Sequence, residues 1–173
     1  MTSNTPLPAT FKPSGPLTGT ISVPGDKSIS HRALIFSALA VGKSRITGLL
    51  EGEDVLATAD ALRMMGAKIE KKDDVWTVHG VGVGGLMQPD NVLEMGNSGT
   101  STRLLMGLIA SHPISATFTG DASLTKRPMG RVIEPLSRMG ADMRARETAD
   151  HKECLPLTVN GLCPAVPIAY RLP

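Results

Sequence analysis

Residues 24–32, PGDKSISHR, gather a glycine turn, a lysine, hydroxyls and an arginine in front of the apolar run 33–41. That run favours a helix, so these groups stand at its N-terminus. Free backbone N–H groups and the positive end of the helix dipole attract anions there. Lys27 adds a point charge, and the planar guanidinium of Arg32 suits a phosphate or a carboxylate. The segment therefore predicts a binding site for a small anion.

Two later segments carry groups of the same kind. Residues 96–103, GNSGTSTR, place glycines and hydroxyls ahead of an arginine, and glycine lets a backbone approach a ligand closely. Residues 120–130, GDASLTKRPMG, form a basic loop in which Pro128 suits the first position of a helix. That helix start would place Arg127 at the mouth of the helix. Taken alone, a capped glycine turn explains the first segment equally well, and a surface salt bridge explains the second.

No metal or nucleotide cofactor is predicted. A P-loop needs a glycine directly before the lysine, where Asp26 stands. Cys154 and Cys163 lack zinc-ligand spacing and are expected to be reduced thiols. The acidic pair 73–74 is expected in a hairpin turn. The acidic cluster around Asp54 is explained by capping of a helix N-terminus.

The composition excludes several classes of protein. With 41% hydrophobic and 20% charged residues, the 173-residue chain is typical of a globular protein. A net charge of +2 is too small for general polyanion binding, and 3% aromatic residues offer few stacking platforms for single-stranded nucleic acid. No apolar run approaches the roughly 18 residues that span a bilayer, and the N-terminus lacks the pattern of a secretory signal. Neither nucleic acid nor a membrane is expected as a partner, and a cytoplasmic location is expected.

The elements that position these segments can be read from periodicity and turn residues. Strands are expected over 18–23, 44–47, 67–71 and 75–79, because β-rich residues alternate there between turn signals. Helices are expected over 28–41, closed by Gly42, and over 54–65, with Asp54 as N-cap and Gly66 after the last turn. Because the first helix is apolar on nearly every face, the sequence predicts that it is buried all round.

The pattern repeats along the chain. Gly25, Ser30 and Arg32 recur 71 positions later as Gly96, Ser101 and Arg103, and the register persists with a slow drift to the end of the second hairpin. The sequence therefore predicts two βαβαββ units, 21–90 and 91–166, preceded by a lead-in segment, 1–20. Residues 167–173 resemble the lead-in strand and are expected to start a third unit that is cut off. We therefore expect an N-terminal fragment of a longer protein, or one half of a split protein.

Four motifs in order, PGDKSISHR (24–32), LLEGED (49–54), GNSGT (96–100) and KRPMG (126–130), resemble the 5-enolpyruvylshikimate-3-phosphate synthase family. The match runs from about Leu17, covers about two-fifths of such an enzyme, and is similar to the bacterial subclass with G-D-K. The resemblance implies an α/β fold, α+β in some schemes, with βαβαββ repeats that place helices inside and sheets outside. It implies two domains of three units each, with two units of one domain present here and the segment 1–20 belonging to the second domain.

The resemblance also implies a reaction: transfer of the enolpyruvyl group of phosphoenolpyruvate to the 5-hydroxyl of shikimate 3-phosphate, with release of phosphate. It implies a tetrahedral intermediate, no metal, no cofactor and a monomeric intact enzyme of aromatic amino-acid biosynthesis. It implies that Lys27 contacts both substrates and assists proton transfer. It further implies that shikimate 3-phosphate is held by Ser28 and Arg32, and phosphoenolpyruvate by Gly99 and Arg127. Supporting candidates are Asn97, Thr100 and Arg103. The chain alone is expected to be inactive without a C-terminal portion or a complementary fragment.

Two other functions stay open at this point. The sister enolpyruvyl transferase that acts on UDP-N-acetylglucosamine typically has Lys-Asn at the first helix and a reactive cysteine in the third loop. Here the first helix has Lys27-Ser28, and the loop 120–130 lacks cysteine. The chain could also be a non-catalytic anion-binding or assembly half of a split protein. For an intact enzyme, the resemblance implies sensitivity to the inhibitor glyphosate, because some tolerant relatives have alanine where Gly99 stands.

Overall fold

The computed structural model describes residues 8–171. Along the chain the elements are α1 (Lys27–Leu39), β1 (Val41–Thr47), α2 (Glu53–Met64), β2 (Lys68–Lys72), β3 (Val75–Val81), β4 (Leu93–Glu94), α3 (Gly99–Ala110), β5 (Ser115–Thr119), the 3-10 helix η1 (Leu124–Lys126), α4 (Gly130–Arg138), β6 (Asp142–Glu147) and β7 (Glu153–Asn160). None of the helices in this part of the chain is long and apolar enough to cross a bilayer.

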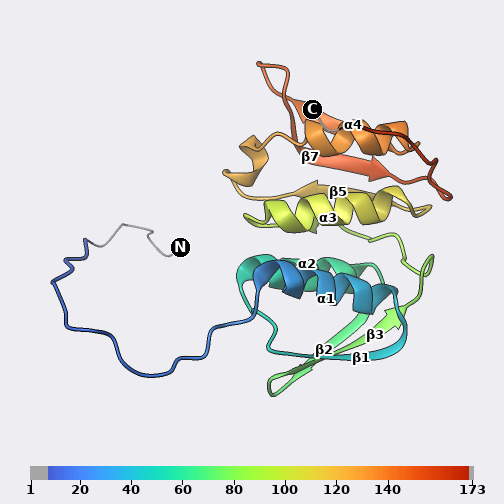
Figure 1. Ribbon diagram of the computed structural model, residues 1–173. Helices are drawn as coiled ribbons and strands as arrows, with labels where there is room; N and C mark the ends of the chain where they lie inside the picture. Colours follow the sequence, from blue (N-terminus) through green and yellow to red (C-terminus); the bar gives the residue numbers. More distant parts are fainter. Residues whose placement is uncertain (1–7, 172–173) are drawn as a thin grey trace.

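Two sheets enclose the first three helices. The first sheet has the order β1-β3-β2 and is antiparallel, and the second has the order β4-β5-β7-β6, in which only β4 and β5 run parallel. In Figure 1, α1, α2 and α3 lie between the two sheets. The predicted α/β class and the placement of helices inside and sheets outside are therefore confirmed. The core is mostly aliphatic: besides Phe118, its largest fully buried side chains include Leu34, Leu62, Met65, Leu105, Met106 and Ile109.

The expected strand over 18–23 is wrong. These residues form no strand, and Leu17, Ile21 and Val23 are exposed, in a segment that extends away from the body (Figure 1). Alternation of β-rich residues favours an extended backbone, but a strand also needs a hydrogen-bonded neighbour. Neither sheet of the described residues includes residues 18–23, and β1, the edge strand that follows them in the chain, pairs only with β3. The segment therefore has no hydrogen-bonded neighbour.

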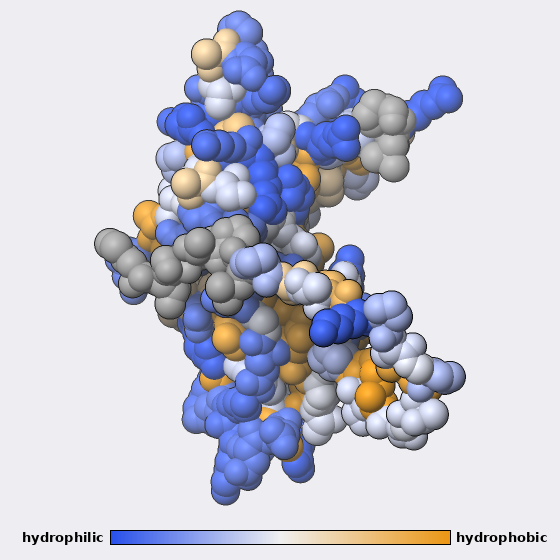
Figure 2. Space-filling model, turned by 90° about the vertical axis from the view of Figure 1, so that its left-hand side faces the viewer, coloured by the Kyte–Doolittle hydropathy of each residue, from blue (hydrophilic) through white to orange (hydrophobic). Residues whose placement is uncertain are grey.

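The expected burial of α1 on all sides is also wrong. Leu34 and Ala38 are fully buried against α2 and β3, whereas Ile29 and Phe36 are 69% and 66% exposed. Figure 2 shows hydrophobic surface in the middle of one face, at the height that α1 and α2 occupy in Figure 1. The apolar helix is therefore covered on one side only, because no described element packs on its other side.

Several predicted boundaries move by one to three residues. Helix α1 begins at Lys27 because the Asp26 carboxylate accepts a hydrogen bond from the Ile29 N–H at 2.7 Å, and it ends before Gly42, which lies within β1. Helix α2 begins at Glu53 with Gly52 as its N-cap, so Asp54 does not cap it. Helix α4 begins at Gly130, and Pro128 therefore precedes the helix instead of opening it.

The sequence repeat corresponds to repeated backbone contacts. A Cβ on Gly80 would overlap the carbonyl oxygens of Ser37 and Ala40 at the end of α1. A Cβ on Gly161 would overlap the carbonyl oxygens of Ile109 and His112 at the end of α3. Glycine recurs at this place because the end of a helix rests directly on the backbone of a following segment, where a side chain has no room.

Candidate active site

The first cluster of predicted site residues surrounds the N-terminus of α1. Lys27 is the first helical residue, and its ammonium group forms an ion pair with the carboxylate of Asp54 in the first turn of α2. One turn further along α1, Arg32 donates a hydrogen bond from Nη1 to the carbonyl oxygen of Ser28 at 3.0 Å. The two N-termini of α1 and α2 therefore meet at Lys27, and Ser28 and Arg32 lie exposed beside it.

Asp54 belongs to the candidate site, although the sequence analysis explained it only as a cap of a helix N-terminus. It lies in the first turn of α2, but Gly52 is the N-cap, which leaves the carboxylate free to pair with Lys27. Its side chain is 24% exposed, and that of Lys27 is 49% exposed. The only sequence signal is an acidic residue in a first helical turn, which the helix dipole explains equally well. Tertiary packing of α1 on α2 decides its partner.

The second cluster consists of Gly99 and two guanidinium groups. A Cβ added to Gly99 would lie 2.7 Å from Nη1 of Arg103 and 3.2 Å from Nη1 of Arg127. Burial lowers the pKa of Arg103, and the positive charge of Arg127 lowers it further. Neither arginine takes part in an ion pair within residues 8–171. Two adjacent cations that form no ion pair among these residues, at the N-terminus of α3, form a site for an anion.

Asn97 and Asp121 hold Arg127 in this cluster. The side-chain oxygen of Asn97 accepts a hydrogen bond from Arg127, and its Nδ2 donates to Oδ2 of Asp121 at 2.6 Å. The other carboxylate oxygen of Asp121 accepts hydrogen bonds from the backbone N–H groups of Ser123, at 2.9 Å, and Leu124, at 2.7 Å. The hydrogen bond from Asn97 lowers the pKa of Asp121 most, and these N–H groups and the nearby positive charge of Arg127 lower it further. Asp121 therefore fixes both the turn that carries Arg127 and the amide that receives it.

Sequence reasoning did not single out Asp121. The sequence signal is an aspartate two and three positions before the N–H groups from which its carboxylate accepts hydrogen bonds, which is the spacing of an Asx turn.

The three supporting candidates, Asn97, Thr100 and Arg103, do not all lie in this cluster. Asn97 and Arg103 belong to the cluster, and Arg103 also donates to the carbonyl oxygen of Pro128 at 3.2 Å. Thr100 lies in the first turn of α3, half-buried.

A direct contact links the two clusters. The hydroxyl group of Ser101, in the first turn of α3, donates to the backbone carbonyl oxygen of Asp54 at 2.9 Å. The first turns of α1, α2 and α3 therefore lie at one end of the helical layer, in contact through Asp54. The structure brings Lys27, Ser28 and Arg32 to one side of this junction, and Asn97, Gly99, Arg103 and Arg127 to the other.

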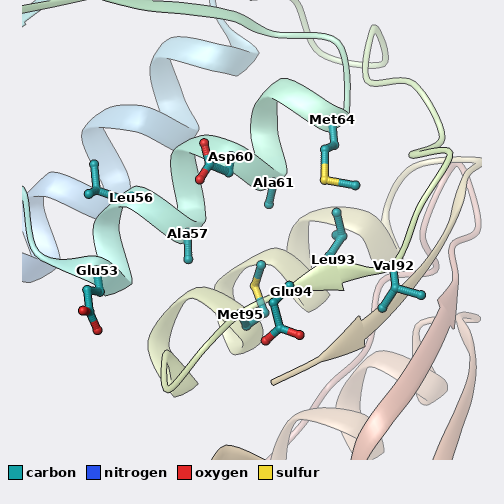
Figure 3. A pocket seen from close by; sticks show the side chains of 10 residues that line it. All are labelled: Glu53, Leu56, Ala57, Asp60, Ala61, Met64, Val92, Leu93, Glu94 and Met95. Atoms are coloured by element: carbon teal, nitrogen blue, oxygen red, sulfur yellow. The ribbon is translucent and has the colours of Figure 1, made fainter. Parts of the chain in front are cut away.

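Two pockets are lined by residues of these clusters, and a separate groove lies nearby. A pocket of about 270 Å³ is lined by Lys27 and Asp54, and one of about 500 Å³ by Arg103 and Arg131. The groove in Figure 3, of about 410 Å³, lies between α2 and the segment around β4. Its only charged lining residues are acidic: Glu53, Asp60 and Glu94. This groove repels anions, whereas the pocket lined by Arg103 and Arg131 attracts them. The pocket at Lys27 has mixed charge, because Glu53 and Asp54 also line it.

No group of three or more histidine, cysteine, aspartate or glutamate side chains among residues 8–171 is arranged to hold a metal ion. Asp73 lies in the turn between β2 and β3, as predicted, and its φ of +54° lies in the left-handed region. Cys154 is buried and Cys163 is exposed, and neither forms a disulfide. The charged groups of the site are therefore supplied by lysine, arginine and aspartate side chains.

Comparison with known proteins defines the class. The family model of EPSP synthase, also described as 3-phosphoshikimate 1-carboxyvinyltransferase, matches residues 11–173. The chain belongs to the EPSP synthase family. It is 66% identical to the 3-phosphoshikimate 1-carboxyvinyltransferase of Sphingopyxis alaskensis over the whole chain, and 67% identical to that of Novosphingobium aromaticivorans over 96% of it.

A solved structure agrees with this assignment. The EPSP synthase from Acinetobacter baumannii superposes with a TM-score of 0.82 at 46% identity, over 88% of this chain and 34% of that one. The chain spans 39% of the length of the Sphingopyxis protein and 37% of the Novosphingobium protein. The predicted family is confirmed, and so is the expectation that the match covers about two-fifths of such an enzyme.

Proposed function

We propose that the protein containing this chain transfers the enolpyruvyl group of phosphoenolpyruvate to the 5-hydroxyl of shikimate 3-phosphate. A C–O bond forms between that hydroxyl oxygen and C2 of phosphoenolpyruvate, the hydroxyl proton is lost, and the bond from C2 to the phosphate oxygen breaks. The observation that carries the proposal is Gly99 beside two guanidinium groups that form no ion pair among residues 8–171, next to the junction that holds Lys27. Both substrates are small polyanions, which such a site binds.

The residue roles that the family resemblance implies are compatible with the two clusters. Ser28 and Arg32 bind shikimate 3-phosphate on α1, and Gly99 and Arg127 bind phosphoenolpyruvate at α3. Lys27 lies between them, contacts both substrates and assists the proton transfer. Catalysis then comes from positioning two anions and stabilising the charge that develops as they react. The Asp54 carboxylate holds the Lys27 ammonium group in place and offsets part of its charge until the substrates bind.

Residues 1–173 carry one part of this site in our proposal. The segment 1–20 belongs to a second domain, which agrees with the exposed course of residues 8–20 away from the body (Figure 1). The units 21–90 and 91–166 form two of three units in the first domain, with 167–173 starting the third. The exposed apolar face of α1 supports this arrangement, because a third unit would cover it. The intact enzyme is proposed to be a monomer in the cytoplasm that needs no cofactor.

A fusion enzyme tests the proposed function. It joins residues 1–173 to the part of the Sphingopyxis alaskensis relative that follows the matched region. Phosphate release from the two substrates is expected from the fusion enzyme and not from residues 1–173 alone. Activity of the chain alone would refute the partial site. A folded fusion enzyme that releases no phosphate would refute the reaction and favour a non-catalytic anion-binding or assembly module.

Gly99→Ala is expected to weaken phosphoenolpyruvate binding and to weaken glyphosate binding more. The new methyl group would lie 2.7 Å from Nη1 of Arg103 and 3.2 Å from Nη1 of Arg127, so both guanidinium groups must shift. We expect a KM for phosphoenolpyruvate about tenfold higher, which corresponds to about 1.4 kcal/mol. The inhibition constant for glyphosate, the longer molecule, is expected to rise by a larger factor. Steady-state kinetics of the fusion enzyme check both, and equal factors would contradict the steric explanation.

Asp121→Ala is expected to raise the KM for phosphoenolpyruvate about fivefold, because each charge-assisted hydrogen bond contributes about 1.5 kcal/mol and water replaces part of it. The substitution releases Asn97 and the turn that carries Arg127. The KM for shikimate 3-phosphate is expected to stay within about twofold. Asp150→Ala removes another exposed carboxylate, which pairs with Lys152, and it is the matched control. If both variants change the KM equally, Asp121 has no positioning role.

A further inference from the structure

A buried chain of polar side chains crosses the helical layer behind the site. Nδ1 of His31, on α1, lies 2.8 Å from the hydroxyl oxygen of Thr58 on α2. The Thr58 hydroxyl donates to that of Ser101, on α3, at 2.8 Å, and Ser101 contacts the hydroxyl of Ser98, the N-cap of α3. All four side chains have no more than trace exposure to solvent. We define His31, Thr58, Ser101 and Ser98 as the interhelical network.

The network meets the site at Asp54. The backbone carbonyl oxygen of Asp54 accepts from Ser101 at 2.9 Å and lies 3.3 Å from the Thr58 hydroxyl. That carbonyl belongs to the residue whose carboxylate pairs with Lys27. Through these contacts the first turn of α2 has one defined position relative to α1 and α3. Buried and partnered networks of this kind specify a unique packing, because any displacement leaves a hydroxyl group without a partner.

The protonation of His31 is consistent with a fixed network. Burial lowers its pKa, and the neighbouring charges of Lys27 and Arg32 lower it further, while Asp54 opposes them. The neutral ring with its proton on Nδ1 donates to Thr58, Thr58 donates to Ser101, and Ser101 donates to the Asp54 carbonyl oxygen. Nε2 has no hydrogen-bond partner in this part of the chain. A buried acceptor without a partner costs less than a buried charge, so this neutral form suits the site.

We propose that the interhelical network is a positioning device that sets the spacing between Lys27 and Gly99. The inference rests on the proposed function, in which phosphoenolpyruvate bridges Lys27 on α1 and Gly99 on α3. The groups that we assign to shikimate 3-phosphate within residues 1–173 lie, by contrast, on α1 alone. Loss of the network therefore weakens phosphoenolpyruvate binding selectively. A role in stability alone lowers the amount of folded enzyme and leaves both KM values unchanged.

Thr58→Val, Thr58→Ser and Thr102→Val in the fusion enzyme test this proposal. Thr58→Val removes the central hydroxyl, and we expect a KM for phosphoenolpyruvate about tenfold higher with that for shikimate 3-phosphate within about threefold. Thr58→Ser restores the hydroxyl and is expected to restore the KM to within about threefold of the wild type. Thr102→Val is the matched control: its hydroxyl is equally buried but donates at 2.8 Å to the Ser98 carbonyl oxygen within α3. Equal KM changes in Thr58→Val and Thr102→Val, or no rescue by serine, would overturn the proposal.

A second readout separates this proposal from the proposed function. The ¹⁵N resonances of the His31 ring report its tautomer and the hydrogen bond at Nδ1, and they do not require turnover. Thr58→Val is expected to shift the Nδ1 resonance, and Thr58→Ser to return it toward the wild-type position. If the wild-type fusion enzyme releases no phosphate, the reaction is refuted, and an unmoved Nδ1 resonance would refute the network independently. If the enzyme is active and the KM for phosphoenolpyruvate stays unchanged in Thr58→Val, only the network fails.

Discussion

Lys27→Met is expected to lower kcat/KM of the fusion enzyme about 10³-fold, which corresponds to about 4 kcal/mol of transition-state stabilisation. Methionine retains most of the side-chain volume and removes the ammonium group that we place between the two substrates. Its present partner, Asp54, is then left as an unbalanced negative charge beside two polyanions. The free energy of unfolding is expected to change by less than about 1 kcal/mol, because partly exposed ion pairs contribute little to stability.

Two variants make the Lys27 result specific. Lys43→Met removes an exposed lysine from β1, in the sheet on the outside of the layer, and is expected to leave kcat/KM within about twofold. Lys27→Arg keeps the charge but changes its shape and reach, and is expected to recover only part of the activity. A Lys27→Met enzyme within tenfold of wild-type activity would contradict the assigned role. A large loss of stability would instead show that the ion pair with Asp54 is structural.

Gly80→Ala is expected to destabilise the protein by about 3 kcal/mol, the upper range for overpacking a rigid site. The methyl group would overlap the carbonyl oxygens of Ser37 and Ala40, which are backbone atoms and cannot rotate away. Helix α1 must then move off β3, and the packing that holds Leu34 and Ala38 against the sheet loosens. Urea unfolding of the fusion enzyme measures the change as a lower midpoint of the transition.

Gly130→Ala is the control for Gly80→Ala. Gly130 is the first residue of α4, and a Cβ added there would meet only Oε2 of Glu153, at 3.2 Å. That oxygen is the flexible end of an exposed side chain. We expect a change within about 0.5 kcal/mol, since alanine also favours a helix over glycine. Equal midpoints for the two variants would show that α1 does not rest on β3 as closely as the structure places it.

Much of the fold could be predicted from local signals. The hairpin between β2 and β3 follows from alternation around a turn with Asp73, and the end of α2 follows from Gly66. The strand expected over 18–23 failed because alternation reports an extended backbone and not the partner that makes it a strand. The burial of α1 failed for a related reason. Hydropathy reports which surface must be covered, while the neighbours that cover it are determined by distant parts of the chain.

The residues of the candidate site also fall into two groups: those that the sequence predicted and those that only the tertiary structure revealed. The types and spacing of Lys27, Ser28, Arg32, Gly99 and Arg127 predicted anion-binding helix starts, and the four motifs predicted the family that the comparisons confirm. Only the tertiary structure decided that Asp54 pairs with Lys27, that Asp121 holds Asn97, and that Thr58 joins His31 to Ser101. Local residues determine where a backbone presents free N–H groups and charges, because helix starts are local structures. Which side chains meet across helices depends on packing over long sequence separations, and a linear pattern does not contain that information.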